Sequence, residues 1–227
     1  MIDVKFPLNY TKNNGVTAVG IAAFRGNLKV LEMLYKAGAD INVTSKEGAG
    51  PLYLAIKQDR IDCIKYLIER NAFVHLYDPS QAEFSPLFQS IKLANFAALE
   101  CICDTGIDLD QLRDQNGYSP LTFAAFSNQD SILNYISLRV RNLDDEDPFE
   151  AHTVFVHYVL KNDFEMASKL LQRGSNLNYT NRDGKTPLSL AILLENDNAV
   201  KYLLGKGADP HYEDLIGKDS CDYAKES

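Results

Sequence analysis

The chain has 227 residues, of which 45% are hydrophobic and 24% are charged, the balance of an ordinary globular protein. Its net charge of −8, with Lys and Arg scattered along the chain, argues against a nucleic-acid partner, because phosphate binding needs clustered cations. No apolar run approaches the length of a membrane span, so we expect no direct insertion into a membrane.

From the N-terminus onward, the sequence repeats itself about every 33 residues. Such a period is typical of a solenoid, in which each repeat buries its apolar face against its neighbours. We expect an N-terminal arm at 1–11 and one solenoid at 12–227, with repeats at about 12–44, 45–79, 80–113, 114–147, 148–180 and 181–213 and a partial capping repeat at 214–227. Each repeat places a Pro or its substitute ahead of a short apolar segment, at Ala18, Pro51, Pro86, Pro120, Val154, Pro187 and Ser220.

Two helices are predicted in each repeat. Thr186 has the side chain to cap a first helix, and Pro187 suits the first helical turn, where its missing N–H costs nothing. A second helix should end in a left-handed residue, and four glycines stand where that is needed, Gly38, Gly106, Gly174 and Gly207. Asn71 tolerates this conformation but Val140 does not, so we expect a distortion at the end of the fourth repeat.

The sixth repeat carries the most complete motif. It reads Asp183-Gly184-Lys185-Thr186-Pro187-Leu188-Ser189-Leu190-Ala191, then a second helix, then Gly207-Ala208-Asp209. This resembles the ankyrin repeat, whose signature is D-x-x-G-x-T-P-L-H-x-A and G-A-D-x-N. The first, second and fourth repeats share parts of it in register, and the fifth is the most degenerate. The resemblance implies an all-α ankyrin-repeat solenoid of six repeats plus a partial C-terminal repeat, with β-hairpin fingers at 40–48, 108–117 and 176–184.

Catalysis and cofactor binding have little support. The four histidines lie in different repeats, and no Ser, Cys or carboxylate stands beside one in a nucleophile–base spacing. Cys101 and Cys103 are too close in sequence for a zinc pair, and Cys63 and Cys101 fall on expected core positions. We therefore predict a non-enzymatic protein without cofactor or metal, for which a small-molecule ligand is not expected.

The resemblance implies that protein partners lie along the concave face, formed by finger tips and first helices. The position near the end of each first helix is not dictated by the scaffold, and four of its six occupants are large and apolar. The predicted contact residues are Phe24, Lys57, Lys92, Phe126, Leu160 and Leu193 on helices and Phe84, Tyr118 and Phe149 on fingers. The alternative, that these side chains pack onto neighbouring repeats, is strongest for Leu160 and Leu193 and weaker for Phe24 and Phe126.

An acidic run, Asp144-Asp145-Glu146-Asp147, falls on the finger between the fourth and fifth repeats. It predicts either a docking tip for a basic partner or a solvated loop, and charge runs are more often the latter. The junction of these repeats, at about 140–161, is also the predicted weakest link of the solenoid because its motif is the poorest.

Taken with the resemblance, these patterns predict an adaptor or a stoichiometric subunit of a larger assembly. The alternative is an inhibitor or assembly chaperone that blocks a partner's functional surface. A third class, an acceptor of modification, is implied by Asn42 and Asn178, which match the finger Asn that hydroxylases modify in some ankyrin repeats. The chain start lacks a signal-peptide pattern, which favours an intracellular, cytoplasmic location, with nuclear, cytoskeletal or organelle association left open.

Overall fold

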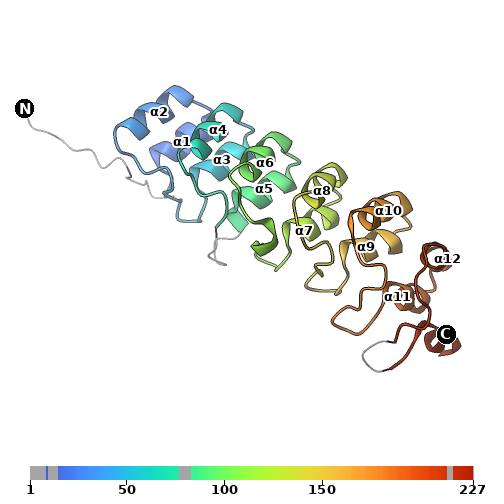
Figure 1. The fold of residues 1–227 in the computed structure, drawn as a ribbon. Coiled ribbons are helices and arrows are strands. Elements are labelled where there is room, and N and C mark those ends of the chain that lie inside the picture. The colour runs from blue at the N-terminus through green and yellow to red at the C-terminus, as the bar shows by residue number, and fades with distance from the viewer. Residues whose placement is uncertain (1–8, 10–14, 77–82, 214–216, 227) are drawn as a thin grey trace, which may run out of the picture. The chain divides into compact units, whose positions relative to one another are not determined.

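The computed structural model describes residue 9 and residues 15–76, 83–213 and 217–226. Within these residues the chain consists of short helices joined by turns (Figure 1). The predicted arm at 1–11 lies outside the described residues except for Asn9, and so does the predicted start of the last repeat at 214–216. The structure forms two compact units: an N-terminal unit, Met1–Asp108 with Arg113–Gln115, and a C-terminal unit, Leu109–Leu112 with Asn116–Ser227.

The N-terminal unit contains three helical hairpins. They pair α1 (Ala18–Arg25) with α2 (Leu28–Lys36), α3 (Pro51–Lys57) with α4 (Ile61–Glu69), and α5 (Pro86–Lys92) with α6 (Phe96–Cys103). The first helices α1, α3 and α5 pack side by side in one layer, and α2, α4 and α6 do so in a second. Branched aliphatic side chains fill the core between the layers, including Leu31, Ile56, Ile64, Leu67, Leu87, Ile91, Leu99 and Ile102.

The C-terminal unit repeats this plan. A short 3₁₀ helix, η2 (Leu109–Gln111), precedes the hairpins α7 (Pro120–Phe126) with α8 (Asp130–Ser137), α9 (Val154–Leu160) with α10 (Phe164–Arg173), and α11 (Pro187–Leu193) with α12 (Asp197–Gly205). The last helix, α13 (Ser220–Glu226), packs against α11 as a half repeat. Helix α7 packs against α9, and Phe155 is the largest fully buried side chain in the chain's described core.

The helix starts confirm the period found in the sequence. The seven first helices begin at Ala18, Pro51, Pro86, Pro120, Val154, Pro187 and Ser220. Local chemistry explains this: Thr17, Ser119, Thr153 and Thr186 each accept a backbone N–H at their helix start, and Thr186 completes a capping box with Ser189. Four of the helices carry Pro at the first turn, as expected.

The helix ends also follow the predicted rule. Gly38, Gly106, Gly174 and Gly207 all have positive φ, between 79° and 112°, and Asn71 has φ of 63°. Val140 does not adopt this conformation, and the predicted distortion is present. The Arg139 and Val140 N–H groups both donate to the Ile136 carbonyl, at 2.8 and 3.1 Å, whereas after Gly38 the Ala39 N–H donates five residues back, to Leu34. The next N–H, of Arg141, donates to the carboxylate of Asp110 in the preceding finger, at 3.0 and 3.3 Å.

The fingers are tight turns rather than regular β-hairpins. In the finger of the first repeat, the Ser45 N–H donates to the Ala49 carbonyl at 2.9 Å, and in that of the fifth repeat the Asn181 N–H donates to the Lys185 carbonyl at 3.0 Å. The finger at 108–117 contains η2. Among the described residues, β-pairing is limited to one isolated bridge between Glu146 and Thr153.

Side-chain oxygens of one finger bind the backbone of the next repeat. The Asn42 Oδ1 accepts from the Phe73 N–H at 2.8 Å, and the Asn178 Oδ1 accepts from the Asp209 N–H at 3.1 Å. Asp144 accepts from the Asn176 N–H at 3.0 Å in the same way. These bonds join residues 31 or 32 positions apart, and they hold successive fingers in register within each unit.

Candidate functional site

The fourth and seventh residues of each first helix share one face, because positions three apart lie on the same side of a helix. The seventh position carries the six predicted contact residues on helices. Phe24, Lys57, Lys92 and Leu193 are exposed, and Phe126 and Leu160 are half-buried. The fourth position, which the sequence reasoning did not use, is exposed or half-buried in five helices, as Ile21, Leu54, Phe123, His157 and Leu190.

Four rings gather on this face of the C-terminal unit, and we call Tyr118, Phe126, Phe149 and His157 the aromatic patch. The Tyr118 ring centroid lies 5.6 Å from that of Phe126 and 5.7 Å from that of Phe149. The Phe126 and His157 rings are 4.2 Å apart. Phe149 is 68% exposed, so the patch opens to solvent on the finger side. The structure thus brings together three of the predicted contact residues.

His157 was missed by the sequence reasoning, although its helical register places it three positions before Leu160. Burial, with the nearby positive charges of Lys161 and His152, lowers the pKa of His157 to about 4, so its ring is neutral at pH 7. Its Nε2 is buried and has no hydrogen-bond partner within the described part of the chain. The patch therefore contains one unsatisfied polar atom among aromatic rings.

In the N-terminal unit the predicted residues are more dispersed. Phe84 packs edge-on against Tyr53 at 5.3 Å, and the Lys57 Nζ lies 5.9 Å from the Tyr53 ring centroid. Phe24 is 42% exposed on α1, and Lys92 is exposed on α5. In this unit, the structure does not bring the predicted residues into one cluster.

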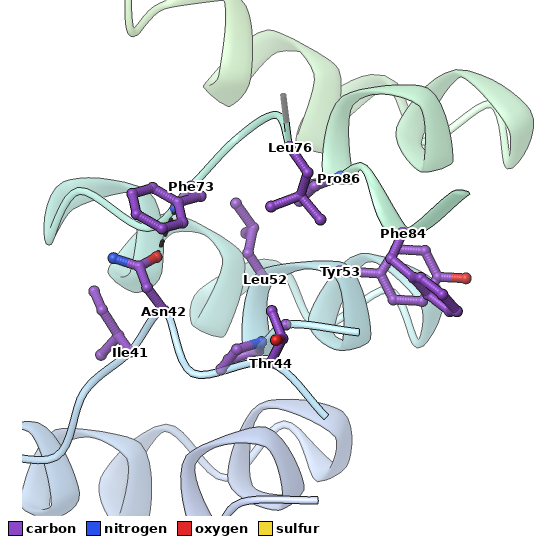
Figure 2. Close-up of a pocket in the computed structure, with 11 residues that line it drawn as sticks. Ile41, Asn42, Thr44, Leu52, Tyr53, Phe73, Leu76, Phe84 and Pro86 are labelled. Atoms are coloured by element: carbon purple, nitrogen blue, oxygen red, sulfur yellow. Dashed lines mark hydrogen bonds between the residues drawn. The ribbon is translucent and has the colours of Figure 1, made fainter. Parts of the chain in front are cut away.

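A small cleft lies between two fingers of the N-terminal unit (Figure 2). Asn42 and Thr44 of the first finger, the start of α3, and Phe73, Leu76 and Phe84 of the next finger line it. Figure 2 shows the bond from the Phe73 N–H to the Asn42 side chain at the edge of this cleft. Its volume of about 20 Å³ is room for about one water molecule and far too small for a drug-sized ligand.

The acidic run requires a correction, because these residues do not form the exposed docking tip or solvated loop that we expected. Asp147 is fully buried, and its carboxylate accepts from the N–H groups of Phe149, Glu150 and His152 at 2.8 to 2.9 Å. Asp144, Asp145 and Glu146 are half-buried, and Glu146 accepts from the Arg182 N–H at 2.9 Å. Asp144, Glu146 and Asp147 thus accept hydrogen bonds from backbone N–H groups.

The fold brings one histidine beside a serine that lies ten positions further along the chain. The His75 Nδ1 is 2.9 Å from the Ser85 Oγ. Ser85 is fully buried and burial lowers the pKa of His75, so the pair faces the protein interior and not a substrate. The Ser85 side chain makes no cap bond to α5. We interpret this pair as structural.

Two clusters of metal-ligand type occur in the C-terminal unit. Asp147, Glu150 and His152 form one, but the Asp147 carboxylate is already occupied by three backbone bonds. His211, Asp219 and Cys221 form the other. The four cysteines all lie in the described residues and none is in a disulfide; Cys63 is buried as expected, whereas Cys101 is half-buried.

In the part of the chain that the structure describes, no helix combines the length and the apolar character needed to span a membrane.

A sequence profile described as "Ankyrin repeats (3 copies)" matches residues 2–78 and 138–214, which together make up more than half of the chain. The chain belongs to the ankyrin repeat family. Ankyrin repeat domains are typically protein–protein interaction modules and are usually non-catalytic, although some relatives are parts of larger enzymes. Membership accounts for the period, the capped first helices and the left-handed helix ends.

Individual relatives share the repeat at low identity. Human transient receptor potential cation channel subfamily A member 1 is 24% identical over 220 residues, which cover 93% of this chain and 20% of the channel. A Saccharomyces cerevisiae protein, the 26S proteasome regulatory subunit p28, is 28% identical over 118 residues, or 51% of each chain. This chain therefore spans only part of these relatives' length.

Among solved structures, the ankyrin repeat domain of Bcl-3, a member of the IkappaB family, has a TM-score of 0.79 at 20% identity. The match covers 93% of this chain and 95% of that domain. At this identity the likeness shows the fold alone.

Proposed function

We propose that this chain is a protein-binding adaptor or a stoichiometric subunit of a larger assembly, and that the aromatic patch is its principal contact surface. The observation that carries the proposal is the group of rings on two successive repeats, with Phe149 exposed at its edge. Aromatic side chains dominate the energy of protein interfaces, because they bury a large area at a low cost in conformational entropy.

Burial decides which part of the patch a partner can reach. The His157 Nε2 is buried, whereas the Phe149 ring is 68% exposed. The remaining predicted contact residues, Phe24, Lys57, Phe84, Lys92, Leu160 and Leu193, stay proposals for the rest of the surface. Because ankyrin repeats typically act inside cells, we propose an intracellular location as well.

The test is affinity purification of the full chain from its native source, followed by quantitative mass spectrometry, with one variant in the patch and one matched control. Phe149→Ser removes a ring that is 68% exposed. Leu138→Ser removes an apolar side chain of equal exposure, 67%, just after α8 and away from the patch. We expect the first variant to lose its main partner at least about tenfold, which corresponds to 1.4 kcal/mol, and the control to retain it.

The same purification distinguishes the roles. A single complex at constant stoichiometry supports a subunit, and many partners in small amounts support an adaptor. The alternative is an inhibitor or assembly chaperone that blocks a partner's functional surface. It requires that the partner's activity fall when this chain binds. Equal recovery of the partner by both variants would contradict the assignment of the patch.

A further inference from the structure

The second metal-ligand cluster lies at the C-terminal cap. His211 belongs to the finger after α12, while Asp219 and Cys221 stand at the start of α13. One ring nitrogen of His211, a carboxylate oxygen of Asp219 and the Cys221 Sγ all lie within 4.8 Å of one another. The His211 Nδ1 and the Asp219 Oδ2 are 2.9 Å apart. Three different ligand types thus converge on one point.

Backbone hydrogen bonds hold this arrangement in place. The Asp209 Oδ1 accepts from the His211 N–H at 2.9 Å, and Asp209 is itself held by Asn178. The Ser220 N–H donates to the Pro210 carbonyl at 3.1 Å, which ties the finger to the start of α13. These bonds fix the main chain next to each ligand residue, so the cluster does not depend on long flexible side chains.

The two carboxylate oxygens of Asp219 have different hydrogen-bond partners. Its Oδ1 accepts from the Asp222 N–H at 2.9 Å and so caps α13. Its Oδ2 points to the His211 ring. A metal ion that replaced the hydrogen bond between Oδ2 and His211 would therefore leave the cap of α13 intact.

We propose that His211, Asp219 and Cys221 bind one Zn²⁺ ion, with water as the fourth ligand. Thiolate, imidazole and carboxylate are the ligands that zinc prefers, whereas Ca²⁺ and Mg²⁺ prefer oxygen alone. Zinc bonds of about 2.0–2.3 Å place tetrahedral ligand atoms roughly 3.3–3.8 Å apart, within the span of this cluster. The Nδ1 and Oδ2 atoms must separate slightly, which His211 permits because its side chain is 74% exposed.

Binding would replace the proton of the Cys221 thiol by the metal and release that proton to solvent. The ion would join the last finger to the half repeat, because its ligands come from both. Since zinc would bind the folded cap more tightly than the unfolded chain, it would slow local opening of α13.

The experiment uses the reduced full chain, with Co²⁺ as a spectroscopic probe and Zn²⁺ as its competitor. We expect one equivalent of Co²⁺ to produce a thiolate charge-transfer absorption, and one equivalent of Zn²⁺ to remove it. Cys221→Ser should abolish this absorption, and His211→Gln should weaken Zn²⁺ binding at least about tenfold, the loss that follows even from removing an outer-shell partner. Cys103→Ser, which changes a half-buried thiol on α6, is the matched control and should bind as the wild type does.

Two results would overturn the proposal: no thiolate absorption in the wild type, or an absorption that survives Cys221→Ser. Helical circular dichroism of each variant without metal checks that it folds. If Cys221→Ser disturbs the fold of the cap, the deciding measurement is the Zn²⁺ affinity of the His211→Gln variant, because His211 is exposed. An unchanged affinity in that variant would contradict the proposed site. Hydrogen exchange provides a second measure, since Zn²⁺ should slow exchange in α13 and leave α3 unchanged.

Discussion

Asp147 is buried and stabilises a turn, although it belongs to an acidic run that suggested an exposed loop. Four consecutive acidic residues are usually solvated, and nothing local reveals that one of them will be buried. The three N–H groups that Asp147 binds belong to a turn that no other acceptor satisfies at these positions. Neutralising the whole run would therefore destabilise the fold, so it is not a clean test of docking to a basic partner.

We expect Asp147→Ala to lower the free energy of unfolding by about 2–3 kcal/mol, because it leaves buried backbone donors without an acceptor. Glu150→Ala is the control, since Glu150 is exposed in the same turn, and it should change stability by no more than about 0.5 kcal/mol. Urea denaturation measures both. Equal effects of the two substitutions would show that the Asp147 bonds contribute little.

His157 leads to a prediction about pH. Its pKa of about 4 in the folded chain lies below the ordinary value of 6.5, so the unfolded chain takes up the proton first as the pH falls. The stability that depends on neutral His157 is fully present above about pH 6.5 and is lost progressively toward pH 4. Allowing for partial solvent screening, we expect a loss on the order of 1 kcal/mol between pH 7 and pH 5.

The check is a comparison of unfolding free energies at these two pH values in the wild type and in His157→Phe. The variant should lose less stability than the wild type, because the ring that replaces the imidazole does not titrate. An NMR titration of the wild type should place the midpoint of His157 near 4. A midpoint close to 6.5 would show that the ring is more accessible to water than the structure indicates.

Among the elements, helix starts were predictable and finger contacts were not. A helix start depends on a Thr or Ser and a Pro within a few residues, as at Thr186 and Pro187, and that information is local. The acceptors Asp110 and Asp144 instead bind backbone groups 31 and 32 residues away, and any of several fingers could have supplied those groups. The aromatic patch was found in part, because the seventh helical position was considered and the fourth was not.

The junction of the fourth and fifth repeats combines weak and strong features. Val140 lacks the left-handed end, and Ala151 is held at a φ of 56°, which is unfavourable for a residue with a Cβ. Helix α9, however, is largely buried, with Phe155 and Val159 fully enclosed. A poor motif has therefore not given a poorly packed helix.

We expect fast hydrogen exchange at this junction to be confined to residues 138–150. Amides of α9 should exchange as slowly as those of α3 and α11, the first helices of the second and sixth repeats, because exchange follows local burial and packing. Mass spectrometry of exchanged peptides at neutral pH would measure this. Rapid exchange throughout 140–161 would support the prediction from the motif alone, that the whole junction is weak. Uniform protection would contradict both that prediction and the narrower one made here.

Over the molecule as a whole, stability in a repeat protein is carried by contacts between neighbouring repeats. Helix α13 packs against α11, the first helix of the sixth repeat. Tyr223 is central to this packing: it is 5% exposed, and its ring and hydroxyl both meet Lys185 of the preceding finger, with the Lys185 Nζ 4.0 Å from the ring centroid. Loss of this side chain should therefore act locally.

We expect Tyr223→Ala to destabilise the C-terminal cap by about 2–4 kcal/mol, the usual cost of removing a large buried side chain. Tyr212→Ala, at a tyrosine 44% exposed just before the cap, is the matched control and should have little effect. Hydrogen exchange should quicken in α11, α12 and α13 and stay unchanged in α1–α4, since nearest-neighbour coupling weakens along the repeats. If protection fell equally in α1–α4, the chain would unfold as one cooperative body, and the cap would govern the stability of every repeat.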